Sequence, residues 1–319
     1  MLRILSIDGG GIRGLIPGTV LAAIEKSTQK PIAKLFDVIA GTSTGGILAC
    51  GLSAPGDGGN PRFSASTLVD MYVQEGARIF PQHIFERITE LLGEKYPATG
   101  IENVLHKYVG ESRLSETVTE ILITAYDIER RKPKFFRSRD ARDDPTKDHP
   151  LWMVARATSA APTYFEPFKL PGAAPGDHEA LVDGGVFANN PAMCAYVDGS
   201  VGPGQVRPDD VFVVSLGTGS QNRPIMYDRV KDWGQLQWAK PILNVVFDGV
   251  SATTDYQLEQ ILGDDHYFRL ETELTIASDD LDRATPENLR NLQLQADKLI
   301  ADNEQILDRI CARLTAQEH

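Results

Sequence analysis

The chain begins with LRILSIDGGGIRG at residues 2–14, the stretch that does most to define its fold. Residues 2–7 are a short apolar run that predicts a buried strand. Residues 14–28 read as a helix, with Pro17 tolerated in its first turn. The glycines between them allow a tight turn in which backbone N–H groups face one point. A strand, a tight turn and a helix in this order predict one unit of a parallel sheet covered by helices.

The same order recurs along the chain. A predicted strand at 36–40 runs into GTSTGG at 41–46, and a helix follows from residue 44 to about residue 52. Ser66 is expected to cap another helix. Further predicted strands cover 120–127, 134–136, 180–182 and 211–216, and predicted helices cover 151–160 and 289–314.

These elements predict an α/β fold: a single domain over residues 1–319, with three layers and a mainly parallel central sheet flanked by helices. The motif-bearing part is expected at about 1–219 and a C-terminal helical part at about 220–319. Neither an internal repeat nor a low-complexity tract interrupts the sequence.

Composition limits the function classes. The 319 residues are 42% apolar and 24% charged, as in ordinary globular proteins, and the formal net charge is −12. That charge argues against nucleic acid as a partner, because phosphate backbones require clustered positive charge. We see no secretory signal and no apolar run near the ~18 residues of a membrane-spanning helix. The expected location is therefore cytoplasmic, with peripheral contact at a membrane as an option.

The glycine loop at 8–14 leaves two functions open. Its N–H groups, beside a helix N-terminus, suit either a phosphate or a developing oxyanion. Gly9, Gly11 and Gly14 also match the dinucleotide fingerprint GxGxxG, which requires an acidic residue about 20 positions later at the end of the next strand. Asp37 has nearly that separation but begins its strand. A merely tight turn is the third interpretation.

A second motif points to nucleophilic catalysis. Gly41, Ser43 and Gly45 form GxSxG between an apolar strand and a helix, the context in which a nucleophile elbow projects its serine hydroxyl. The helix that follows directs its positive dipole end toward developing charge. The alternative is a structural glycine-rich turn.

A third motif supplies a carboxylate. Asp183, followed by Gly184 and Gly185, comes directly after the predicted strand at 180–182. α/β folds place reacting groups at such strand ends. By itself the motif is better explained as an Asx-turn before a helix that starts at 189–191.

A serine nucleophile needs a base, so the histidines matter. Ser43, Asp183 and His266 follow the chain order of the α/β-hydrolase triad. However, His266 stands at an ordinary strand start, and Ser43 follows only the second predicted strand. We read all six histidines as structural or solvent-exposed.

Taken together, the three motifs resemble the patatin-like phospholipases, a family of lipid acyl hydrolases with a Ser–Asp dyad and no catalytic histidine. The resemblance runs from the N-terminus to about Gly219, and no motif residue departs from the family pattern. Supporting stretches are 76–80, 159–165 and 215–219.

The resemblance implies residue roles. Ser43 would attack the ester carbonyl to form an acyl-enzyme, Asp183 would accept the proton and later activate water, and Arg13 would steady the glycine loop. The oxyanion hole would be formed by the backbone N–H groups of Gly9, Gly10 and Gly11. No metal or organic cofactor is implied. Because a solvated aspartate is a poor base, we expect Asp183 to be shielded from water.

The implied substrate is a phospholipid or another lipid ester, cleaved by phospholipase A or lysophospholipase chemistry. The alternatives are a signal-activated effector that degrades membranes, as in antiphage defence, which would need a small-molecule activator, and, more remotely, a dinucleotide-binding oxidoreductase.

Two surface segments could serve other partners. The basic stretch 130–142 contains Phe135 and Phe136 and could touch a membrane transiently, although a solvated hairpin paired with neighbouring acids is the simpler interpretation. The apolar spacing over 289–314 predicts a helix or helix pair packed on the domain, with a homo-oligomer interface as the alternative.

Overall fold

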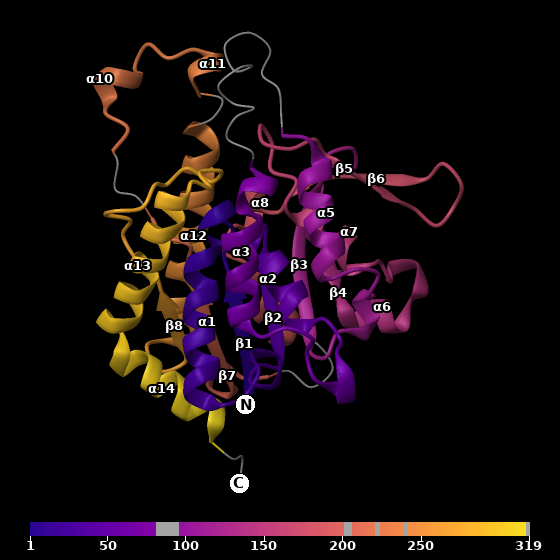
Figure 1. Ribbon diagram of the computed structural model, residues 1–319, viewed down its shortest axis with the longest axis vertical. Coiled ribbons are helices and arrows are strands. Elements are labelled where there is room, and N and C mark those ends of the chain that lie inside the picture. Colours follow the sequence, from indigo (N-terminus) through magenta and orange to yellow (C-terminus); the bar gives the residue numbers. More distant parts are fainter. Residues whose placement is uncertain (81–95, 201–205, 221–223, 239–240, 317–319) are drawn as a thin grey trace.

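A central sheet with helices on both faces organises the molecule (Figure 1). The computed structural model describes residues 1–80, 96–200, 206–220, 224–238 and 241–316. The strands of the sheet in these ranges are β1 (Leu2–Ile7), β2 (Val38–Thr42), β3 (Glu120–Asp127), β4 (Lys132–Arg137), β5 (Phe168–Pro171), β6 (His178–Asp183), β7 (Val211–Leu216) and β8 (Tyr267–Leu270). The helices are α1 (Leu15–Thr28), α2 (Thr44–Ser53), α3 (Ala65–Ile79), α5 (Ala98–Tyr108), α6 (Ser138–Asp143), α7 (Leu151–Thr158), α8 (Gly185–Ala188), α9 (Ala192–Ser200), α10 (Tyr227–Val230), α11 (Gln235–Trp238), α12 (Pro241–Leu262), α13 (Pro286–Asp302) and α14 (Glu304–Thr315).

The sheet is mainly parallel. Its order is β5-β6-β3-β2-β1-β7-β8, and β4 pairs separately with β3. The run from β3 to β8 is parallel throughout, whereas β4, β5 and β6 join by antiparallel pairing. The carboxyl ends of β1, β2 and β7 therefore meet at one end of the molecule, opposite the two chain termini in Figure 1.

The alternation of side chains along each strand divides the interior into two cores, which makes the fold three-layered. On β1, Leu5 and Ile7 pack into a core shared with α1, α2, α3 and the C-terminal helices. Ile4 faces the other way, into a core shared with α9 and α12. Because both faces are covered, these strands are apolar at nearly every position, as the sequence indicated.

Most predicted elements are present, with shifted ends. The strands predicted at 2–7, 120–127 and 211–216 have those bounds. The second strand begins at Val38 instead of residue 36, because the Phe36 N–H closes a turn onto the Ile32 carbonyl. The helix expected to start at Ser66 is capped by Ser64, whose hydroxyl accepts a hydrogen bond from the Thr67 N–H.

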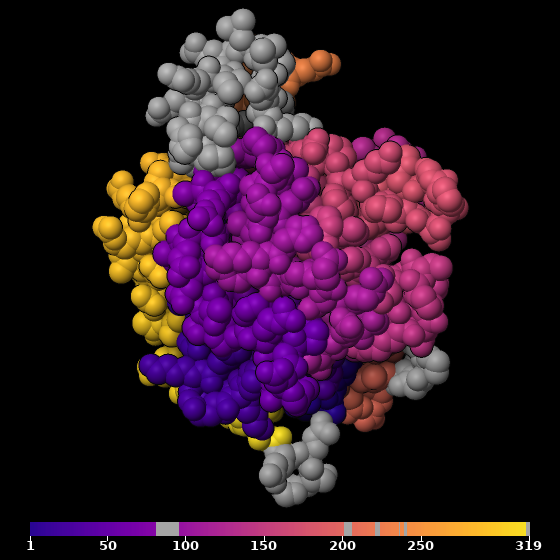
Figure 2. Space-filling view, turned by 45° about the vertical axis from the view of Figure 1, so that its right-hand side comes forward, coloured from indigo at the N-terminus to yellow at the C-terminus, as the bar shows by residue number. Residues whose placement is uncertain are grey.

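The predicted C-terminal helix is a pair, α13 and α14, separated at Asn303. Its apolar residues face the domain: Leu292 and Ile310 are fully buried, and both helices pack against α1. This apolar stripe is therefore used within the chain, as the packing interpretation requires. Figure 2 shows the N-terminal third and the segment after it forming one continuous body.

Candidate active site

Ser43 lies at the sharp turn between β2 and α2. Its φ of 55° and ψ of −122° are unusual for a residue with a side chain, and such strain costs about 1–3 kcal/mol. The turn is held by the Ser43 N–H, which donates to Thr158 Oγ1 at 2.8 Å. Gly45 is required here because a Cβ would collide with the Ile7 carbonyl of β1. The strained backbone places the hydroxyl at the carboxyl end of the sheet.

Strand β3 brings Asp183 to Ser43 across 140 positions of sequence. Thr42, just before the serine, pairs with Thr124 on β3, and the next β3 residue, Ala125, pairs with Asp183 on β6. The two side chains line the same pocket. Thr42 Oγ1 also donates to the backbone carbonyl of Ala188, at the end of the short helix that follows Asp183.

Asp183 is buried, with only 1% of its surface exposed. The loss of hydration raises the pKa of its carboxyl from 3.8 to about 7, and interactions with the Ser43 hydroxyl and the Gly185 N–H partly oppose that rise. Oδ1 accepts the Gly185 hydrogen bond at 2.8 Å, whereas Oδ2 makes no hydrogen bond of ordinary geometry within the described structure. A poorly hydrated carboxylate oxygen close to a hydroxyl is able to accept its proton.

The glycine loop borders the same pocket, but its three N–H groups are not equivalent. The Gly9 N–H already donates to the Asn189 carbonyl at 3.0 Å, and Gly9 does not line the pocket. Gly10 and Gly11 do line it, next to Ser43. Of the three predicted oxyanion donors, Gly10 and Gly11 are therefore the ones positioned to meet a ligand.

Arg13 holds the glycine loop through side-chain hydrogen bonds. Its Nε donates to the Gly10 carbonyl at 3.3 Å and its Nη1 to the Gly219 carbonyl at 2.7 Å. Thr218 adds a third link, since its hydroxyl donates to the Gly9 carbonyl at 2.8 Å. The supporting motif at 215–219 is thus the segment against which the glycine loop is held.

A buried charge network lies beneath the loop, and sequence reasoning did not find it. Arg269 on β8 donates to Asp8 Oδ2 at 2.7 Å and to Glu271 Oε2 at 2.8 Å. Glu271 in turn accepts the Gly219 N–H at 2.8 Å. Burial raises the pKa of Asp8 to about 6, against the lowering effect of Arg269. The one available signal was a charged residue inside the apolar strand YFRL at 267–270.

The remaining motif glycines are sites of close packing. Gly14 lies against Thr44, Gly41 against the backbone of Gly45, and Gly184 against Thr124. Gly185 lies against the ring of Phe247, a residue of α12 that forms one wall of the pocket. A side chain at these positions would force the elbow and the Asp183 strand apart.

The pocket around Ser43 and Asp183 is narrow, with about 40 Å³ of free volume, and mostly apolar. Its apolar side chains come from both halves of the chain: Ile12, Ile47, Ile79, Phe80, Ile101, Phe165, Phe247 and Leu281. Such a lining favours an acyl chain over a charged cofactor.

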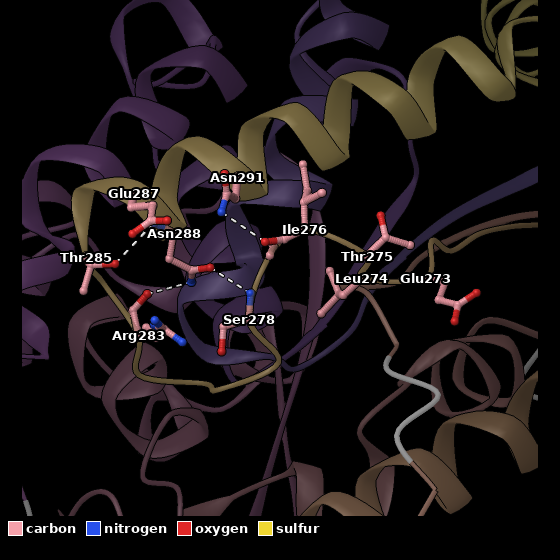
Figure 3. Close-up of a pocket in the computed structure, with 11 residues that line it drawn as sticks. Glu273, Leu274, Thr275, Ile276, Ser278, Arg283, Thr285, Glu287, Asn288 and Asn291 are labelled. Carbon is pink, nitrogen blue, oxygen red and sulfur yellow. Dashed lines mark hydrogen bonds between the residues drawn. The ribbon is translucent and has the colours of Figure 1, made fainter.

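A larger cavity of about 470 Å³ lies elsewhere, beside the start of α13 (Figure 3). In this cavity the Asn288 amide accepts a hydrogen bond from the Ser278 N–H and donates one to the Arg283 carbonyl. Neither Ser43 nor Asp183 lines it.

Two alternative assignments lose support. The Nδ1 atom of His266 is hydrogen-bonded to the Val211 carbonyl at 2.7 Å, at the amino end of β7. Ser43 lies beyond the opposite end of the sheet. Asp37 is likewise at the amino end, where it forms an ion pair with Arg3 at 2.9 Å. It is therefore not placed to bind a ribose near the glycine loop, as a dinucleotide site requires. The described residues hold no cluster of three or more His, Cys, Asp or Glu suited to a metal.

Five of the seven cations in the basic stretch 130–142 have acidic partners in the described structure. Lys134 pairs with Glu179 at 2.8 Å, and Arg137 with Asp198 at 2.7 Å. Further pairs are Arg130 with Asp127, Arg139 with Asp198 and Arg142 with Glu120. The pairing agrees with the interpretation of a stretch paired with acids, but Glu120, Glu179 and Asp198 are not the neighbouring acids expected from the sequence. Among the described helices, none is long and apolar enough to cross a membrane.

Comparison with known proteins agrees with the motifs and extends beyond them. The family model of the patatin-like phospholipases matches residues 5–196. Patatin-like protein 2 of Arabidopsis thaliana is 36% identical, an alignment that covers 94% of this chain and 83% of the relative. Patatin-like protein 1 of Oryza sativa subsp. indica is 35% identical over 94% and 81% of the two chains. Patatin-1-Kuras 2 of Solanum tuberosum is 32% identical over 94% and 86%. The chain therefore belongs to the patatin-like phospholipases, a family of lipid acyl hydrolases.

Proposed function

We propose that this protein is a phospholipase A or lysophospholipase that cleaves fatty-acyl esters with a Ser43–Asp183 dyad. One observation carries the proposal: a strained serine and a buried aspartate with a pKa near 7 face the same apolar pocket. The lining suits a fatty-acyl chain, and the family membership supports a lipid ester as the substrate.

The first half-reaction acylates the enzyme. Ser43 Oγ attacks the ester carbonyl carbon while its proton passes to Asp183 Oδ2. The carbonyl oxygen takes the negative charge and accepts hydrogen bonds from the N–H groups of Gly10 and Gly11. The bond to the alcohol then breaks, and the alcohol leaves with the proton held by Asp183. The acyl group remains on Ser43.

The second half-reaction releases the fatty acid. Water gives a proton to Asp183 and attacks the acyl carbon, and the same two N–H groups stabilise the oxyanion. The bond to Ser43 Oγ breaks as the proton returns from Asp183 to that oxygen. The fatty acid leaves, and both side chains are restored.

Burial makes an aspartate suitable as the base. An ordinary aspartate with a pKa of about 3.9 holds a proton too weakly to assist a serine hydroxyl. A pKa of about 7 strengthens proton acceptance by roughly three orders of magnitude and still leaves half of the groups ionised at pH 7. The Arg269 network and Arg13 would hold the oxyanion donors in place without touching the substrate.

The direct test is fatty-acid release from vesicles of phosphatidylcholine, phosphatidylethanolamine and phosphatidylglycerol, and from lysophospholipid micelles. We expect release by the wild type and none by Ser43→Ala or Asp183→Asn. A matched control is Ser159→Ala: Ser159 also lines the pocket, but its hydroxyl donates to the Ala155 carbonyl at 2.7 Å. Release that persists in Ser43→Ala would contradict the mechanism.

The protein would meet its lipid as a peripheral, cytoplasmic enzyme, an expectation that rests on the sequence and that cell fractionation tests. Lipid hydrolysis that begins only after a small molecule is added would favour the signal-activated effector instead.

A further inference from the structure

An exposed apolar surface stands next to the candidate active site. We define the α10–α12 surface by five side chains that are at least two-fifths exposed: Ile225, Met226, Tyr227, Ile242 and Val245. Tyr227 and Met226 are the most exposed, at 75% and 61%. In Figure 1, α10 and the start of α12 lie at the same end of the molecule. Several large apolar side chains exposed at one end indicate a contact surface, whereas single exposed ones need no explanation.

The position of this surface connects it with the pocket. Helix α12 carries both Phe247, which is buried in the pocket wall, and Val245 and Ile242, which face outward. Five residues of helix separate Ile242 from Phe247, a rise of about 7.5 Å along the axis. In Figure 1, α10 and α11 stand at the end of the molecule opposite the termini, and this is the end to which β1 and β2 point. Orange atoms project from that end in Figure 2.

The chemistry of the surface suits a lipid headgroup boundary. Trp233, three residues after α10, and Trp238, at the end of α11, pack edge to face with 5.3 Å between ring centroids. Tryptophan and tyrosine side chains favour the interface between water and acyl chains. Residues 225–245 contain two acidic and three basic side chains, and Lys231 pairs with Asp228 at 3.2 Å. This stretch therefore carries a formal charge of only +1, although the chain as a whole carries −12.

We propose that the α10–α12 surface is where this enzyme docks on its lipid, a bilayer or micelle with a neutral, zwitterionic surface. The proposal rests on the proposed function, because the lipid bearing the ester is the occupant to which the pocket leads. Docking is driven by apolar insertion, since an acidic protein is repelled by anionic lipid and most cations of the basic stretch 130–142 are paired with acids of the same chain. Docking of this surface places the pocket wall that contains Phe247 next to the lipid.

The test compares two double variants of the full-length protein. Met226→Ser with Tyr227→Ser removes the most exposed apolar groups of the surface. Leu294→Ser with Val197→Ser is the matched control, because these side chains are 52% and 48% exposed on α13 and α9. Flotation with phosphatidylcholine vesicles is measured in a Ser43→Ala background, so that the lipid stays intact. Fatty-acid release from the same vesicles and cleavage of a soluble short-chain ester are measured with Ser43 present.

We expect the first double variant to lose vesicle affinity and vesicle hydrolysis by at least about tenfold. Its kcat/KM on the soluble ester should stay within about twofold, and the control should match the wild type throughout. Wild-type binding should persist at about 1 M salt, where surface charges are screened. Salt-sensitive binding, unchanged vesicle affinity in the first variant, or an equal loss in the control would overturn the proposal.

Two outcomes distinguish this proposal from failure of the proposed function and from a dimer interface at the same surface. Vesicle binding that depends on Tyr227 without any ester cleavage by the wild type would contradict the proposed function and leave the docking surface standing. A wild-type dimer that the Met226 and Tyr227 changes convert to monomer would assign the surface to a second copy of the chain and overturn the lipid assignment.

Discussion

Hydrolysis by this protein is expected to depend on pH through Asp183. Burial holds its pKa at about 7, and only the ionised carboxylate accepts the Ser43 proton. With that pKa, the ionised fraction is about 9% at pH 6, about 50% at pH 7 and about 91% at pH 8. We therefore expect kcat/KM to rise about tenfold from pH 6 to pH 8 and to level off above.

The assay is a pH series from about pH 5 to pH 9 with a soluble short-chain ester, which removes any effect of pH on lipid binding. A midpoint near pH 4, where exposed aspartates titrate, or a flat profile between about pH 5.5 and pH 8 would refute the role of buried Asp183 as the base.

The same burial has a consequence for stability. Because the pKa is higher in the folded chain than the ordinary 3.8, the folded state holds its proton longer, and the wild type loses stability as pH rises from about 4 to about 7. The difference of about three pKa units corresponds to roughly 4 kcal/mol. Asp183→Asn cannot ionise. The free energy of unfolding of Asp183→Asn, measured in urea relative to the wild type, should therefore increase by up to about 4 kcal/mol between pH 4 and pH 8. An advantage that is the same at both pH values would show that Asp183 is not strongly desolvated.

Three further changes test other parts of the site. His266→Ala should keep most ester hydrolysis, and a loss as deep as that of Asp183→Asn would restore a triad. Ser43→Gly should have a free energy of unfolding about 1 kcal/mol higher than Ser43→Ala in denaturant titration, because glycine relieves the positive φ. Both variants should lack activity. A less stable glycine variant would show that the turn is unstrained. Arg269→Gln should cost about 3–5 kcal/mol of stability and lower kcat more than it changes KM, with partial rescue by lysine, because Asp8 loses its buried partner. A rise in KM alone would remove Arg269 from loop positioning.

Local patterns predicted much of this molecule. Strands buried on both faces read as continuous apolar runs, so the strands at 2–7 and 211–216 were predicted with their observed ends. Element ends set by single hydrogen bonds were less predictable, as the Ser64 cap and the late start at Val38 show. The motifs also singled out Ser43 and Asp183, and the fold brings both to one pocket.

The sequence by itself determined the family, the α/β class and the chemical types available, because short-range glycine and apolar patterns encode strand–turn–helix units directly. Only the tertiary structure decided which groups are free to act. The Gly9 N–H is occupied by Asn189, and Asp8 and Glu271 are joined through Arg269. Burial of Asp183 likewise depends on strands and helices drawn from the whole chain. Such contacts link residues as many as 261 positions apart, and no local pattern reports them.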